Sequence, residues 1–438
     1  MKNLCIALLA TATIAAVAAE PLITQVNMTQ GRKRIVRITY TLENAPAIIT
    51  VDIQTNGVSI GDAALSGSGY LSGDVNRMVE EDGTYTISWD VANAWPDHDI
   101  PSGVRAVVSA WSPDTPPDVI VADLTSLSNV AYYTSIEALP GGLLANQAYR
   151  TSKIVMKKIH ASGIPWTMGS GSGELGHETH EYAHEVTLTN DYFIGVFPVT
   201  QSQLEYIGSR NPSAFSKAGD KSMRPAEGLK YIQLRQTSPG DSTVRFANAY
   251  PNEPYAGSVV NLFRTKTGLK FEVPSEAQWE FACRAMNGDG KWGNGTSMTN
   301  ATSDANLPGR YRYNQEDTSL TTPSSEVGKE SGTAEVGSFD ANGFGLYDMH
   351  GNVMEWTLDY YIKDRRTLPD NDAHGAPNAN GDKDLLGDTK ANNVTRIMRG
   401  GAWYKDAGDC RSAERQCPSQ NGNTTGGDRG VRLVIVLD

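Results

Sequence analysis

The sequence is poor in cysteine, in positive charge and in long apolar segments. Its 438 residues include 4 cysteines, and 50 acidic residues outnumber 38 basic ones, giving a net charge of −12. Such an acidic chain repels phosphate backbones and anionic lipid headgroups, which argues against nucleic acid as a partner. Beyond residue 20 no stretch is long and apolar enough to span a bilayer, so we expect no membrane span.

The first 19 residues have the pattern of a secretory signal peptide. Lys2 provides a positive start, an apolar run follows from Leu4 to Val17, and two alanines close it. We therefore expect residues 1–19 to be removed and the protein to be secreted or periplasmic. The alternative, a membrane anchor, needs a longer apolar run. Export permits a disulfide among the three remaining cysteines, Cys283, Cys410 and Cys417.

Residues 20–126 favour an all-β domain. Arg34 to Tyr40 alternates polar and apolar side chains, and Tyr85, Ile87 and Trp89 fall on one face of a second such run. Short alternating runs separated by turn residues predict a β-sandwich, here of the immunoglobulin-like kind. No cluster of catalytic side chains accompanies them, which favours a spacer or adhesion-like module. Residues 127–150 are interpreted as a linker.

Residues 151–438 mix short strands, helices and long loops, which predicts an α+β domain. The local pattern is clearest around Pro274, because the residue before a proline avoids the helical region. Ser275 then caps a helix, and Gln278, three residues on, completes a capping box. Trp279 and Cys283 lie on one face of this predicted helix.

Several motifs of this region occur in an order that resembles one known family. The most specific is NGFGLYDMHGNVMEW at residues 342–356. The others are MGS at 168–170, EVTL at 185–188, PVT at 198–200, RPAEG at 224–228, VPSEAQWE at 273–280 and RGGAW at 399–403. Together they resemble the formylglycine-generating-enzyme (sulfatase-modifying factor) family over residues 151–438. The resemblance implies a C-type-lectin-like fold and, in the family's enzymes, copper-dependent oxidation of a sulfatase cysteine to formylglycine.

By the same resemblance, the residues for this oxidation are incomplete. Family enzymes hold Cu(I) between two cysteines that follow the Gly-Gly motif, and soft thiolates suit that ion. Lys405 stands at the first of these positions, and the second aligns with Cys410. Ala402 replaces a serine. A lysine cannot supply a thiolate, so we expect neither copper nor catalysis. Oxidation by copper stays the alternative, with Cys410 as its remaining catalytic residue.

The resemblance also implies a structural calcium site. Calcium prefers hard oxygen ligands, both carboxylate and backbone carbonyl. Asp348 and Glu355 would offer side-chain oxygens, and Gly351 and Val353 would offer backbone carbonyls. The simpler interpretation is that the two carboxylates only cap turns.

A disulfide between Cys283 and Cys410 is implied in the same way. Family enzymes pair a cysteine on the helix after Ser275 with one on a C-terminal strand, and Cys410 lies one or two residues from that position. A shift by one residue turns a strand side chain to the other face, so a bulge or a two-residue shift is required. The rival is a short Cys410–Cys417 bridge, and three free thiols are the third possibility.

Three histidines, His177, His180 and His184, are spaced like metal ligands. His180 and His184 would share a face if the segment were helical. The resemblance places the segment in a loop, where a solvated loop is the simpler interpretation, and a metal enzyme stays a third hypothesis. The leading hypothesis is a calcium-stabilised, non-catalytic module that binds a protein or glycan, with the polar segment Gln416–Asp428 as its variable loop.

Overall fold

The computed structural model describes residues 19–31, 34–96, 103–215, 221–235, 253–321, 331–360, 396–417 and 426–437. Over these residues the protein is mostly β-structure with few, short helices. It divides into two compact units, each considered by itself. Residues 1–18 of the predicted signal peptide lie outside the described residues. None of the helices described is both long enough and apolar enough to cross a membrane.

The first unit, residues 1–61 and 70–116, contains two antiparallel sheets. One sheet has the order β1-β2-β7-β5, and in the other β3 pairs with β4, β6 and β8. The bounds are β1 (Leu22–Gln30), β2 (Ile35–Glu43), β3 (Ala47–Thr55), β4 (Val58–Ser59), β5 (Leu71–Gly73), β6 (Arg77–Val79), β7 (Gly83–Asp90), α1 (Val91–Ala94) and β8 (Val104–Trp111).

The alternation predicted for β2 and β7 is confirmed. Their register places Val36 opposite Trp89 and Ile38 opposite Ile87, and all four side chains are buried. Side chains two residues apart on a strand point to the same face, so the pairing presents one continuous apolar surface. This surface forms the core of the first unit.

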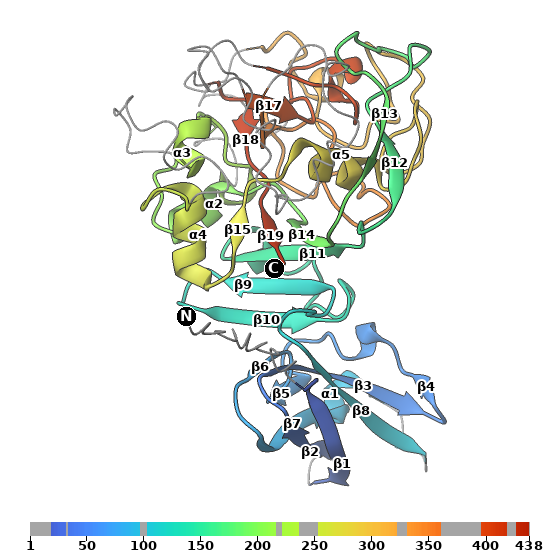
Figure 1. The fold of residues 1–438 in the computed structure, drawn as a ribbon, viewed down its shortest axis with the longest axis vertical. Coiled ribbons are helices and arrows are strands. Elements are labelled where there is room, and N and C mark those ends of the chain that lie inside the picture. The colour runs from blue at the N-terminus through green and yellow to red at the C-terminus, as the bar shows by residue number, and fades with distance from the viewer. Residues whose placement is uncertain are drawn as a thin grey trace, which may run out of the picture. The chain divides into compact units, whose positions relative to one another are not determined.

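The second unit, residues 62–69 and 117–438, is built on a six-stranded antiparallel sheet with the order β10-β9-β11-β14-β19-β15 (Figure 1). Its strands are β9 (Val119–Asp123), β10 (Asn129–Tyr133), β11 (Lys153–Ile159), β14 (Tyr192–Gly195), β15 (Phe271–Glu272) and β19 (Val434–Val436). Val434 of β19 pairs with Ile194 on one side and with Glu272 on the other. A strand from the C-terminal region therefore lies in the interior of the sheet.

The structure divides the chain differently from the boundaries predicted at residues 126 and 150. β9 pairs with β10 and β11, so both β9 and β10 belong to the sheet of the second unit. The first unit ends at Pro116, and residues 127–150 contain β10 and lead from it to β11 within the second unit. The apolar sequence of β9 is compatible with a strand in either unit. Only the strands with which it pairs show that it belongs to the second unit.

Within the described residues, two smaller sheets and four α-helices also belong to the second unit. β12 (Pro165–Met168) pairs with β13 (His184–Thr187), and β16 (Met354–Tyr360) pairs with β17 (Arg396–Arg399) and, in parallel, with β18 (Arg429–Gly430). The helices are α2 (Gln201–Tyr206), α3 (Tyr231–Arg235), α4 (Val259–Thr267) and α5 (Glu276–Arg284). Helices α3 and α4 contact each other, whereas α5 contacts β12, β16 and β17 (Figure 1).

Helix α5 confirms the predicted capping box. The Ser275 side chain accepts a hydrogen bond from the Gln278 backbone, and the Gln278 side chain accepts one from the Ser275 backbone. All nine helical residues are buried, including Glu276, Glu280 and Arg284. Buried charges are costly unless they are paired, so this helix requires charged partners on the segments around it.

Candidate functional site

A tight turn after β17 positions the segment that carries Lys405 and Cys410. Gly400 and Gly401 follow the strand, both with positive φ (94° and 71°). A Cβ atom on Gly401 would lie 2.5 Å from the Cys410 sulfur. Glycine is therefore required at position 401, because the backbone there packs directly on Cys410.

The surroundings of Cys410 and Lys405 do not fit a Cu(I) site. The Cys410 side chain is fully buried, and burial raises the pKa of its thiol. Lys405 Nζ lies 3.6 Å from Asp409 Oδ2 and 5.8 Å from the Tyr404 ring centroid. Ala402 is buried and has no hydroxyl. The segment thus offers one protonated thiol and one ammonium group where two thiolates are needed.

The predicted Cys283–Cys410 disulfide is wrong, because the structure has three free thiols at 283, 410 and 417. Cys283 faces Ser412, with its Sγ 3.4 Å from Ser412 Oγ. Cys410 instead ends a short 3-10 helix (Ala407–Cys410) and packs under the turn after β17. Ser412, two residues beyond Cys410, occupies the position opposite Cys283, so the shift that the disulfide required does not occur. Burial raises the pKa of the Cys283 thiol to about 12.

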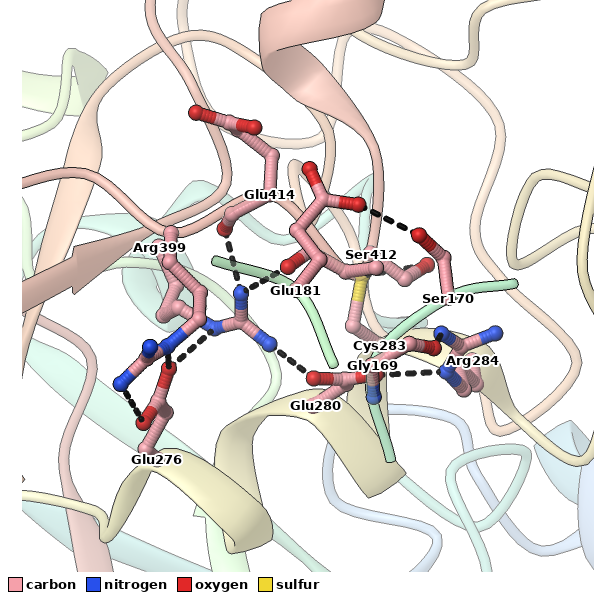
Figure 2. A network of polar contacts seen from close by, with 12 residues as sticks. Gly169, Ser170, Glu181, Glu276, Glu280, Cys283, Arg284, Arg399, Ser412 and Glu414 are labelled. Atoms are coloured by element: carbon pink, nitrogen blue, oxygen red, sulfur yellow. Dashed lines mark hydrogen bonds and ion pairs between the residues drawn. The ribbon is translucent and has the colours of Figure 1, made fainter. Parts of the chain in front are cut away.

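A buried lattice of carboxylates and guanidiniums surrounds this cysteine and connects α5 to β17 (Figure 2). Glu280 accepts hydrogen bonds from the Gly169 backbone (2.8 Å), from Arg284 Nε (2.8 Å) and from Arg399 Nη2. Glu276 accepts from Arg415 Nε at 2.7 Å. Removing one partner of a buried pair typically costs about 3–5 kcal/mol. The lattice therefore fixes α5, the turn at Gly169 and β17 relative to one another.

A second buried cluster adjoins this lattice on the loop that precedes β13. Glu181 accepts hydrogen bonds from Ser170 Oγ (2.6 Å) and from Arg411 Nη1 (2.8 Å), and Arg411 Nη1 also bonds to Glu174 (2.8 Å). Arg411 Nη2 lies 3.5 Å from Glu414 Oε2. Burial and a hydrogen bond with Glu181 raise the pKa of Glu414 well above its ordinary value.

The three predicted histidines do not converge on one point. His177 Nδ1 lies 2.8 Å from Ser170 Oγ, and His184 Nδ1 lies 2.9 Å from the Tyr182 carbonyl oxygen. His180 Nε2 lies 4.0 Å from Glu414 Oε1. Among the described residues, only His180 of the three belongs to a group of possible metal ligands, together with Glu181 and Glu414. Sequence spacing could not indicate Glu414, because it lies more than two hundred residues from His180.

A polar pocket of about 310 Å³ opens beside Lys405. Side chains of both charges line it, and Tyr404 donates a hydrogen bond to Asp428 Oδ2 (2.8 Å). Cys417, the exposed thiol, also contributes to its wall. The lining residues are Met354, Met398, Tyr404, Lys405, Glu414, Arg415, Gln416, Cys417, Asp428 and Arg429. Residues 418–425 of the predicted variable loop lie outside the described residues.

The predicted calcium ligands are buried and rich in oxygen. Asp348 Oδ2 accepts from the Gly337 backbone (2.7 Å), and burial raises the pKa of this carboxyl to about 6. Glu355 accepts from Trp279 Nε1 (2.5 Å) and from Arg432 Nη2 (3.0 Å). Two buried carboxylates thus have one guanidinium between them, which leaves one negative charge. Hard oxygens with excess negative charge fit calcium.

Comparison with known proteins supports a family assignment. A formylglycine-generating enzyme of Mycobacterium tuberculosis is 36% identical over 115 residues, covering 24% of this chain and 32% of the enzyme. The serine/threonine-protein kinase pkn1 of Chlamydia caviae is 28% identical over 252 residues, covering 56% of this chain and 33% of the kinase. This chain thus spans about a third of the length of these relatives. Treponema denticola variable protein 1 is 23% identical, with a TM-score of 0.42 over 65% of this chain and 95% of that protein.

The family profile described as the sulfatase-modifying factor enzyme 1-like domain matches residues 157–437. This range includes the α5 helix, the Asp348–Glu355 segment and the turn after β17. The chain therefore belongs to the sulfatase-modifying factor enzyme 1-like family, in agreement with the resemblance found in its motifs.

Proposed function

We propose that this protein is a non-catalytic binding module of its family, with the polar pocket beside Lys405 as its ligand site. The observation that carries the proposal is the replacement of the two thiolates by one buried thiol and one lysine. Oxidation through Cu(I) needs both thiolates at an accessible position. The alternative function, formylglycine formation, has only Cys410 to support it.

The pocket favours a polar ligand, a protein segment or a glycan. Lys405, Arg415 and Arg429 offer donors, whereas Glu414 and Asp428 offer acceptors. A site that presents both kinds of group at short range can bind hydroxyl and amide groups by paired hydrogen bonds. Gln416 and Asp428, the two ends of the segment interpreted as a variable loop, both line this pocket.

Two further features accompany this proposal. Calcium at Asp348, Gly351, Val353 and Glu355 would neutralise the remaining buried charge and support the second unit. The first unit would act as an immunoglobulin-like spacer, and the signal peptide would direct the protein to the periplasm or outside the cell. An N-terminus at Ala19 or Glu20, measured by mass spectrometry on the exported protein, supports export, and an intact Met1 contradicts it.

A glycan array and a pull-down with peptide libraries test binding on the full mature chain. Lys405→Ala should weaken retention of a captured ligand, because this side chain lines the pocket. Lys291→Ala is the matched control, since Lys291 is exposed on the same unit and does not line the pocket. Equal retention by both variants would place the ligand elsewhere.

A separate assay tests the alternative function. The protein is incubated with a sulfatase-derived cysteine peptide, with and without added copper, and the peptide mass is followed. We expect an unchanged mass, because position 405 supplies no thiolate. Conversion of the cysteine to an aldehyde would overturn the proposal.

A further inference from the structure

The group His180, Glu181 and Glu414 brings together one imidazole and two carboxylates from segments far apart in the sequence. One ligand atom of each residue lies within 4.8 Å of the others. Both glutamates are buried, and the His180 side chain is 20% exposed. Imidazole nitrogen with carboxylate oxygen is a ligand set that suits zinc and other divalent transition metals.

The environment of Glu181 resembles the support that ligating carboxylates receive in metal proteins. Ser170 and Arg411 donate hydrogen bonds to its oxygens and fix its orientation. His177 Nδ1 contacts the hydroxyl of Ser170 in turn. Each carboxylate oxygen has two lone pairs; Glu181 Oε2 accepts two of these bonds and Oε1 accepts one, so Oε1 is the oxygen that would bind an ion. Such outer partners hold a metal ligand in its productive position.

The charge balance at this group differs from that of the neighbouring lattice. Three carboxylates, Glu174, Glu181 and Glu414, form ion pairs with the guanidinium of Arg411. Once Glu414 is ionised, these carboxylates carry more negative charge than Arg411 neutralises, and metal binding would release the Glu414 proton. In the adjoining lattice three carboxylates meet three guanidiniums, which are Glu276, Glu280 and Asp289 with Arg284, Arg399 and Arg415. The group around Arg411 is therefore richer in carboxylates than the lattice beside it.

The group is also within reach of solvent. Glu414 lines the polar pocket beside Lys405, so one of the two carboxylates borders an open cavity. This pocket is therefore the side from which an ion would reach Glu414. A metal site requires such an entry path in addition to its ligands.

We propose that His180, Glu181 and Glu414 bind one divalent transition-metal ion, with zinc as the representative ion. This site is separate from the calcium site proposed at Asp348 and Glu355, and it does not depend on the proposed ligand-binding function. It uses only one of the three histidines that the sequence suggested. The remaining coordination positions would be filled by water from the pocket.

Zinc binding to the full mature chain tests this proposal. The protein is stripped with a chelator, returned to buffer with excess calcium, and titrated with Zn²⁺ by calorimetry and elemental analysis. We expect one bound zinc per chain. Co²⁺ in place of zinc should give visible absorption typical of nitrogen and oxygen ligation.

Four variants separate ligands from neighbours. Ser170→Ala removes a hydrogen-bond partner of a ligand and should weaken zinc binding by roughly 10- to 100-fold. His180→Ala and Glu414→Gln remove ligands and should weaken zinc binding by more than this. His184→Ala should bind like the wild type, because its imidazole lies outside the group. Far-ultraviolet circular dichroism verifies folding, and the partly exposed His180 can be truncated with little risk to the core. No zinc binding by the wild type, or equal binding by His180→Ala and His184→Ala, would overturn the proposal.

Discussion

The position of Ser412 predicts that a single substitution installs the disulfide that this chain lacks. Cys283 Sγ and Ser412 Oγ are 3.4 Å apart, and both residues are buried. Ser412→Cys places a second thiol at this contact, and a modest side-chain rotation brings two sulfurs to bonding distance. The predicted result, after mild oxidation, is a bridge between Cys283 and the thiol introduced at position 412.

The gain in the free energy of unfolding that this disulfide should give follows from the length of the loop that it closes. The two residues are 129 positions apart. Chain-entropy reasoning for such a loop gives about 5 kcal/mol, from which any strain in the folded state is subtracted. The melting temperature of the oxidised variant should then exceed that of its reduced form by on the order of 10 °C.

Peptide mapping without reductant and thermal melts with and without reductant provide the assay. The double variant Cys283→Ser with Ser412→Cys is the control, because it keeps the new thiol and removes its partner. Absence of a peptide that links positions 283 and 412 would refute the placement of Ser412 against α5. The bridged peptide with no gain in melting temperature would refute the loop-entropy argument instead.

Three further predictions concern calcium, thiol reactivity and pH. Calcium should stabilise the protein by about 2.7 kcal/mol at a hundredfold excess over its dissociation constant, and Asp348→Asn should remove the effect of a chelator on the melting curve. Iodoacetamide should modify the exposed Cys417 in the native protein and spare Cys283 and Cys410, because burial raises the pKa values of these two thiols. Peptide masses after labelling measure the modification at each cysteine. Rapid labelling of Cys283 would contradict its burial. The folded-state pKa of Glu414 lies above its ordinary value of 4.5, so its contribution to stability is complete below pH 4.5 and declines as pH rises, by up to about 1.4 kcal/mol per pH unit. Glu414→Gln mimics the protonated form, so its free energy of unfolding, measured with urea on metal-free protein, should decline less above pH 5 than that of the wild type. Parallel pH profiles would show that the pKa of Glu414 is not raised.

Local patterns predicted those features that depend on neighbours in the sequence. The capping box at Ser275 was visible because its partner lies three residues on, and the alternation in β2 and β7 was visible because burial on one face repeats every second residue. The family motifs carried the assignment of the second unit. These features could be predicted because they do not depend on contacts between distant segments of the chain.

Features that depend on distant contacts were missed or misplaced. β9 was assigned to the wrong unit because an apolar strand has the same local sequence whichever sheet it joins. Cys410 was chosen for the disulfide because only the packing under Gly401 shows that it points away from Cys283. The buried lattice of Arg399, Glu280 and Arg284 was also missed, since charged residues are usually exposed. The spacing of Glu280 and Arg284 by four residues on α5 was the available signal.

The interior place of β19 has a consequence for the order in which the second unit can fold. β14 and β15 each need this strand as a hydrogen-bonding neighbour, and the chain supplies it only at residues 434–436. Until then β14 and β15 have unpaired edges, and such edges favour aggregation. During synthesis the sheet therefore remains incomplete across more than two hundred residues, and completion depends on contacts of very long sequence separation, which form slowly.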